Sequence, residues 1–218
     1  MARSALTDAE RLARRNELLA AAHRLYRTRK TLPTVADIAA EAGLAKGTVY
    51  LSFATKEEIF IGLLEDDFVS LLGALPAILA DLPAEPDAAA RHFAGPYTQR
   101  ILSLPDLLPL AAISNGVLEK NLPLEAMTRF KLGLAQALEG NGRLLEARCP
   151  QLASGDGETL LLRTYALTLG LWQSLEYPDA FLETLAKPVF RVLKRDFGPE
   201  LEFAVRRLWE GSLSRSGD

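Results

Sequence analysis

The sequence predicts an all-helical protein. Apolar residues recur at intervals of three and four along almost the whole chain, which is the period of an amphipathic helix. Runs in which β-branched residues strictly alternate with polar ones, as they do in half-buried strands, do not occur in the sequence. Proline and glycine fall between the periodic segments, where helices begin and end.

The first quarter of the chain predicts one long helix followed by short ones. Thr7 and Asp8 are residue types that cap the start of a helix, and either can begin the long one. Thr34 is placed to cap the next helix, which Gly43 ends. The predicted helices span residues 8–28, 35–42 and 45–53, and a fourth begins near residue 55.

The predicted helices beyond residue 60 are longer. Prolines and glycines separate them, and Pro123 and Pro199 suit a first helical turn. Pro188 falls inside one of them and should kink or split it. The predicted ranges are 56–81, 87–103, 105–119, 123–148, 158–176, 179–195 and 199–213.

The composition excludes several classes of protein. Cys149 is the single cysteine of the 218-residue sequence, and there are two histidines, so a disulfide scaffold or a His/Cys zinc cluster cannot form within the chain. The sequence also lacks the apolar core of a signal peptide near its start and any stretch of 18 uninterrupted apolar residues. We therefore expect a cytoplasmic protein without a membrane partner.

The charge is distributed unevenly along the chain. Residues 1–60 carry a net charge of +3, whereas the remainder carries −6. This asymmetry indicates that the N-terminal part meets a polyanion. A chance fluctuation in solvated surface charge explains it equally well.

The segment from Thr34 to Lys56 has the pattern of a helix-turn-helix. Two short helices that cross at a tight turn need a small residue at the crossing and a turn residue that tolerates positive φ. Ala39 and Gly43 supply these. Ile38, Leu44, Val49 and Phe53 are spaced to form the small core under the two helices.

The polar residues of this segment lie where a DNA duplex would meet them. Thr34 opens one helix, at a position where a hydroxyl can hold a phosphate. The first turns of the second helix enter the major groove in such motifs, and Lys56 begins the next helix. Each residue alone has an ordinary explanation as a cap, a solvated charge or a packing group. The candidate DNA-binding residues are Thr34, Lys46, Gly47, Thr48, Tyr50 and Lys56.

Residues 8–60 resemble the DNA-binding domain of the TetR family of bacterial transcriptional regulators. The residues that carry the resemblance are Thr34, Asp37-Ile38-Ala39, Ala42-Gly43, Lys46-Gly47-Thr48-Val49-Tyr50, Phe53 and Lys56-Glu57-Glu58. The resemblance implies a helix-turn-helix domain over residues 1–56, with an N-terminal three-helix bundle. It also implies a helical effector-binding and dimerisation domain over residues 57–218. The expected partners are a double-stranded DNA operator, a second copy of the chain and an unknown small-molecule effector.

The sequence departs from the family pattern in two places. Ala45 stands where the family usually has Ser or Thr, so the recognition helix should lack its customary cap. The family commonly has a glycine after the first helix, whereas this chain has the basic connection Arg29-Lys30-Thr31-Leu32-Pro33. That connection either adds a phosphate contact or is a solvated loop, and we favour the loop.

The C-terminal part shows no catalytic motif, and we expect neither an enzyme nor a cofactor or metal. Abundant apolar helix surface predicts pairing with a second subunit, with ordinary packing inside the chain as the alternative. The helices over residues 158–176 and 199–213 resemble the two that form the four-helix dimer interface of the TetR family, and the seam that this resemblance implies is Leu160, Leu167, Leu171, Val205 and Leu208. The candidate ligand-binding residues, each of which could instead be core, are Phe93, Tyr97, Asn115, Phe130, Tyr165 and Trp172.

These observations favour a homodimeric repressor that a small lipophilic effector releases from a palindromic operator. Two other classes stay open. A small-molecule carrier would keep the pocket and lose operator recognition, as Ala45 and the short basic loop would suggest. An enzyme of unrecognised chemistry would need convergent titratable groups that sequence spacing does not reveal.

Overall fold

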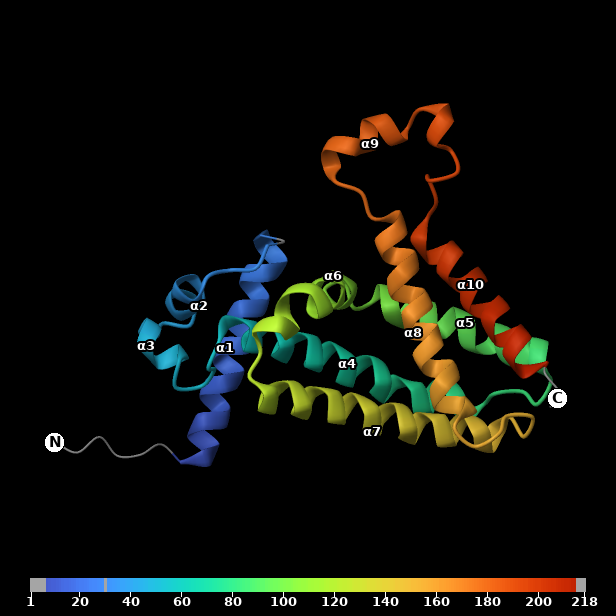
Figure 1. Cartoon of the computed structure of the whole chain (residues 1–218), viewed down its shortest axis with the longest axis horizontal. Coiled ribbons are helices and arrows are strands. Elements are labelled where there is room, and N and C mark those ends of the chain that lie inside the picture. The colour runs from blue at the N-terminus through green and yellow to red at the C-terminus, as the bar shows by residue number, and fades with distance from the viewer. Residues whose placement is uncertain (1–6, 30, 215–218) are drawn as a thin grey trace. The chain divides into compact units, whose positions relative to one another are not determined.

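The computed structural model describes residues 7–29 and 31–214, without the side chains of Asn115 and Val117. All regular elements in these ranges are helices, which confirms the predicted fold class (Figure 1). In chain order they are α1 (Asp8–Arg29), α2 (Val35–Glu41), α3 (Lys46–Val49), α4 (Lys56–Ala80), α5 (Pro86–Leu102), α6 (Leu107–Ile113), η1 (Ser114–Leu118), η2 (Glu119–Asn121), α7 (Leu124–Arg148), α8 (Asp156–Leu175), α9 (Asp179–Leu185), η3 (Pro188–Phe190) and α10 (Phe197–Leu213). No helix in the described part of the chain is long and apolar enough to cross a membrane.

The chain folds into two compact units. The first contains the residues up to Asp67 together with Ile113–Lys131, and the second contains Phe68–Ala112 and the residues from Leu132 onward. Helices α4 and α7 each contribute a part to both units. These units describe which residues pack together, whereas the predicted domain boundary between residues 56 and 57 stays a prediction.

The first unit is built around α1. Leu18, Ile38, Val49 and Phe53 are buried there. Of the four core residues that the spacing predicted, Ile38, Val49 and Phe53 are confirmed, whereas Leu44 is half-buried. The guanidinium carbon of Arg15 lies 4.4 Å from the centroid of the Phe53 ring, which adds a cation–π contact over this core.

The second unit has an aromatic core that joins α5, α8 and α10. The Phe93 ring stacks on Trp209, with centroids 3.6 Å apart. Trp209 donates its indole N–H to the Thr164 hydroxyl at 2.9 Å, and the hydroxyls of Tyr97 and Thr168 are hydrogen-bonded at 3.0 Å. Because every polar group named here has a partner, the hydrogen bonds offset the cost of burying these groups between the three helices.

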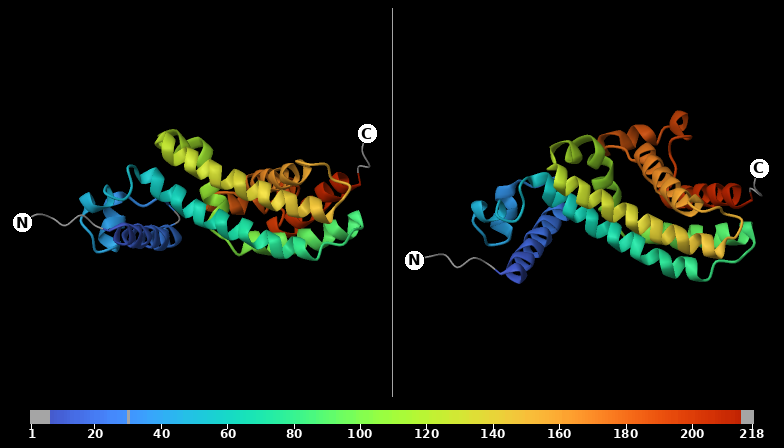
Figure 2. Two further views of the ribbon diagram at one scale, coloured as in Figure 1. Left: turned by 90° about the horizontal axis from the view of Figure 1, so that it is seen from below. Right: turned by 60° about the horizontal axis from the view of Figure 1, so that its bottom comes forward.

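Helices α4 and α7 lie side by side within each unit (Figure 2). In the first unit, the guanidinium of Arg129 on α7 lies 3.4 Å from the carboxylate of Glu58 on α4. In the second unit, the side-chain amide of Asn141 donates to the carbonyl oxygen of Leu72 at 3.2 Å.

Two predicted helices differ from the observed ones, and a third is split as predicted. The segment predicted as one helix over residues 105–119 is α6, followed by the π-helix η1 and the 3₁₀ turn η2. The segment over residues 179–195 is split as Pro188 predicted, because α9 ends at Leu185 and Pro188 begins η3. The segment over residues 45–53 contains the four-residue helix α3, and turns follow it.

Candidate nucleic-acid interface

Helix α2 begins with a complete capping box. The Thr34 hydroxyl accepts a hydrogen bond from the Asp37 backbone N–H at 3.2 Å and donates to the Asp37 carboxylate at 2.8 Å. The same carboxylate accepts the Thr34 backbone N–H at 3.1 Å. These bonds hold the pKa of Asp37 below its usual value. Thr34 is exposed, but its hydroxyl is already committed to the cap.

Gly43 makes the turn that separates α2 from α3. Its φ is +67°, in the left-handed region that favours glycine. Directly after it, the Leu44 N–H donates to the Ala39 carbonyl at 2.8 Å, which closes the turn. Ala39 is buried at this crossing, so its small side chain lets the two short helices approach. The turn chemistry predicted from the sequence is therefore present.

Helix α3 starts without a side-chain cap. Ala45 has the extended backbone of an N-cap residue, with φ −70° and ψ 142°, but it offers no side-chain hydrogen bond. The first backbone amides of a helix need such an acceptor or solvent. The missing cap that the sequence predicted at Ala45 is confirmed.

One face of α3 is anchored and the other is open. Val49 is 1% exposed and packs into the core, whereas Tyr50, the next residue, is 50% exposed. Lys46 and Gly47 are exposed and Thr48 is half-buried. The open face thus carries a cation, a phenol and a glycine that permits close approach, which are suitable groups for base edges and phosphates.

Lys56 is the first residue of α4. Its side chain is exposed, and its ammonium lies 3.9 Å from the carboxylate of Glu57, a weak surface ion pair. The ammonium can therefore turn to a phosphate at little cost. The structure places this predicted residue in the same unit as α3.

A second group of basic residues, which sequence reasoning did not single out, lies on α1. Arg11, Arg14, Leu51 and Ser52 line a depression of about 280 Å³. Leu51 is 75% exposed there. Two arginines three residues apart share one face of a helix, and this spacing is the signal that could have identified them.

The basic connection after α1 is partly neutralised. Arg29 lies 3.0 Å from the Asp37 carboxylate, and Arg24 lies 2.7 Å from that of Glu41 on α2. These pairs tie α1 to α2. Lys30 lies outside the described residues. The pairing of Arg29 favours the interpretation as a loop over that of a phosphate contact.

The predicted ligand-binding residues are divided between the two units. Phe93 and Tyr97 belong to the aromatic core of the second unit, and Tyr165 meets Phe68 edge to face at 5.2 Å. Trp172 is half-buried in the same unit, whereas Phe130 is buried in the first. The side chain of Asn115 lies outside the described residues. The pocket residues stay a prediction.

The predicted dimer seam divides into two kinds of residue. Leu160 and Val205 are buried within the second unit, so they pack inside the chain and leave little surface for a partner. Leu167, Leu171 and Leu208 are half-buried. Helical periodicity places apolar residues on one face of a helix but does not tell which neighbour covers that face, so the seam stays a prediction. Larger exposed apolar side chains on the same helices are Leu162 on α8 and Phe203 on α10.

The remaining chemistry is sparse. Burial raises the pKa of the Cys149 thiol, which favours its unreactive protonated form. Among the described residues, no cluster of three or more His, Cys, Asp or Glu side chains could hold a metal ion.

An all-helical chain in which a glycine turn presents a short, exposed helix has the architecture of the helix-turn-helix DNA-binding proteins. A family model described as bacterial regulatory proteins, tetR family, matches residues 18–63. Another, described as tetracyclin repressor-like, C-terminal domain, matches residues 65–216. The chain belongs to the TetR family and has the fold of its transcriptional regulators.

A solved structure shows the same fold. It is described as a TetR-family transcriptional regulator from Mesorhizobium loti, with a TM-score of 0.60 and 16% sequence identity. The similarity covers 96% of this chain and 98% of the other. A comparison with curated proteins gave no match.

Proposed function

We propose that the protein is a homodimeric transcriptional repressor that binds a palindromic operator. The observation that carries this proposal is the open face of α3. Lys46, Gly47 and Tyr50 are exposed on a helix that Val49 anchors, directly after the Gly43 turn. In a dimer, two such helices enter successive major grooves, and the operator is then palindromic.

Exposed and half-buried apolar side chains on α8 and α10 support the dimer. Phe203 on α10 is 59% exposed, Leu167 and Leu171 on α8 are half-buried, and all three belong to the second unit. Pairing these helices across a twofold axis removes such side chains from water.

In this proposal, a small lipophilic effector releases the DNA. The effector must bind more tightly to the dimer form whose α3 helices no longer match successive grooves, because equal affinity for both forms would shift nothing. Apolar helices dominate the second unit, which suits a lipophilic ligand.

The uncapped, four-residue α3 favours a second candidate, a small-molecule carrier that has lost operator recognition. One titration separates the two functions. Purified protein is titrated against DNA flanking its own gene and against a scrambled duplex, at two salt concentrations, with anisotropy as the readout. Tight binding to the flanking DNA that survives the higher salt, with weak and salt-sensitive binding to the scramble, is the expected result. Equal weak binding to all duplexes tested, extended to tiled genomic fragments, contradicts the repressor.

A further inference from the structure

The connection between α8 and α10 forms an arm over residues 176–196. It contains α9 and η3 and stands beyond the ends of α8 and α10 (Figure 1). The arm has a small core of its own, in which the Phe181 ring meets those of Tyr177 and Phe190 at centroid distances of 5.8 and 5.7 Å. Leu185, which belongs to the same arm, is also buried.

The outer part of the arm is both apolar and basic. Val189 is 77% exposed, Val192 is 66% exposed and Leu193 is 41% exposed. Between residues 187 and 195 there are four basic residues and no acidic one. Three of these, Lys187, Arg191 and Lys194, form no ion pair within the described ranges 7–29 and 31–214. Exposed apolar side chains that are this close in the sequence are candidates for a contact with a partner.

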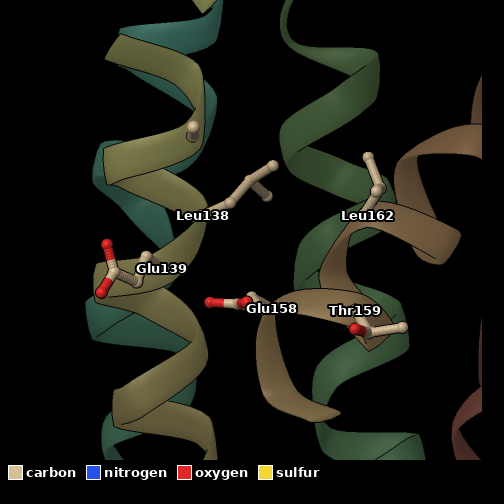
Figure 3. Close-up of a pocket in the computed structure, with 6 residues that line it drawn as sticks. Leu138, Glu139, Glu158, Thr159 and Leu162 are labelled. Carbon is tan, nitrogen blue, oxygen red and sulfur yellow. The ribbon is translucent and has the colours of Figure 1, made fainter. Parts of the chain in front are cut away.

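A groove of complementary character lies between α7 and α8. It has a volume of about 360 Å³, and Ala135, Leu138, Glu139, Glu158, Thr159 and Leu162 line it. In Figure 3, Leu138 points from α7 toward α8, and Glu158 points from α8 toward α7. The carboxylate of Glu139 lies 3.4 Å from the guanidinium of Arg143 on the same helix, so Glu158 supplies the acidic group of the groove. The groove therefore combines apolar walls with one carboxylate, opposite in charge to the arm.

The arm cannot fill this groove in its own chain. It leaves α8 at Leu175, whereas the groove lies along Glu158–Leu162, so the helix itself separates them by about 20 Å. A twofold axis that is perpendicular to α8 near its middle makes the two α8 helices of a dimer antiparallel. The end of α8 that carries the arm then lies beside the start of the partner's α8, where the groove is.

We propose that each protomer inserts Val189, Val192 and Leu193 into the partner's α7–α8 groove. The basic residues of the arm then face the partner's Glu158. This inference rests on the dimer of the proposed function. It adds a second, reciprocal contact to the one that α8 and α10 make, so the arm acts as a strap across the dimer.

The first test is the dissociation constant of the dimer by sedimentation equilibrium. Val192→Asp combined with Leu193→Asp should raise this constant about tenfold or more, because two apolar side chains lose their burial. Val69→Asp is the matched control, since Val69 is 68% exposed on α4, and it should leave the constant unchanged. Circular dichroism checks that each variant is folded.

A charge-reversal cycle tests the pairing itself. Lys194→Glu and Glu158→Lys should each weaken the dimer, and the combination of the two should restore much of the loss. A wild-type dimer that the arm variants leave unchanged overturns the strap and leaves the α8–α10 dimer intact. A wild-type monomer at all concentrations overturns both the strap and the dimer of the proposed function. DNA binding by that monomer would leave operator recognition standing.

Discussion

A Cβ atom on Gly157 would lie 2.3 Å from the carbonyl oxygen of Gly142. A Cβ atom on Gly142 would lie 2.4 Å from the backbone nitrogen of Glu158. Helices α7 and α8 thus meet backbone to backbone at this point, and only glycine on both sides allows it. The contact also fixes one end of the groove that Glu158 lines.

Replacement of either glycine should destabilise the protein. Gly142→Ala or Gly157→Ala forces the helices apart, and overpacking of this kind costs about 1–3 kcal/mol. Thermal unfolding followed by circular dichroism measures the effect. Gly140→Ala is the control on the same helix, because its Cβ would meet nothing within 4 Å. That control should be neutral or gain about 0.5–1 kcal/mol. Equal stability of all three variants would contradict the close contact.

Glu146 on α7 supplies the cap that α8 lacks. Gly155, at the N-cap position, has no side chain, and the carboxylate of Glu146 accepts the N–H groups of Gly155 and Gly157 at 2.8 and 3.0 Å. Glu146→Ala should therefore lower the free energy of unfolding by about 1.5–3 kcal/mol, the range for hydrogen bonds to charged groups. Glu146→Gln keeps an acceptor oxygen and should lose less. Urea unfolding compares them, and identical midpoints for wild type and Glu146→Ala would contradict this role.

The open face of α3 should determine operator affinity. Lys46→Ala and Tyr50→Phe each remove a group that can donate to DNA, so both should weaken binding to the operator. Tyr50→Phe removes only the hydroxyl, so a loss of affinity without a change in melting temperature would assign the contact to that oxygen. Anisotropy titrations measure both variants. Unchanged operator affinity in the Lys46→Ala variant would show that the DNA does not bind at the open face of α3.

Lys56 and Arg14 should act on the phosphate backbone. Lys56→Ala and Arg14→Ala should each weaken binding to every duplex and reduce the salt slope by about one. Arg148→Ala, which removes an exposed charge at the end of α7, is the control and should change neither value. A wild-type salt slope in the Arg14 variant would show that the depression beside Leu51 does not hold a phosphate.

The capping box should make stability depend on pH in acid. The Thr34 hydroxyl and backbone N–H lower the pKa of Asp37 in the folded protein. The ionised carboxylate therefore contributes stability above the unfolded pKa, about 3.9, and this contribution is lost as the pH falls through the folded value. Asp37→Asn should reduce the loss of melting temperature between pH 5 and pH 3. A pH profile parallel to that of the wild type would contradict the assignment.

Local chemistry explains which features the sequence predicted. Gly43 and Thr34 act on their own neighbours, so their turn and cap could be anticipated, as could the missing cap at Ala45. The Glu146 cap depends on a residue nine positions away on another helix, and no local pattern encodes it. The burial of Leu160 could not be predicted for a similar reason, because tertiary packing decides which neighbour covers an apolar face.

Because the start of α3 is uncapped, we expect this helix to become more ordered when the protein binds DNA. A helix of four residues whose N-cap is alanine is marginal by itself, and packing of Val49 holds it. Phosphate oxygens that approach its amides would supply the missing acceptors, so association would carry an unfavourable entropy of ordering. In an Ala45→Ser protein, the serine side chain would cap α3, so this helix would be ordered before DNA binds. Its complex would dissociate more slowly, and calorimetry would find a smaller entropic penalty on binding.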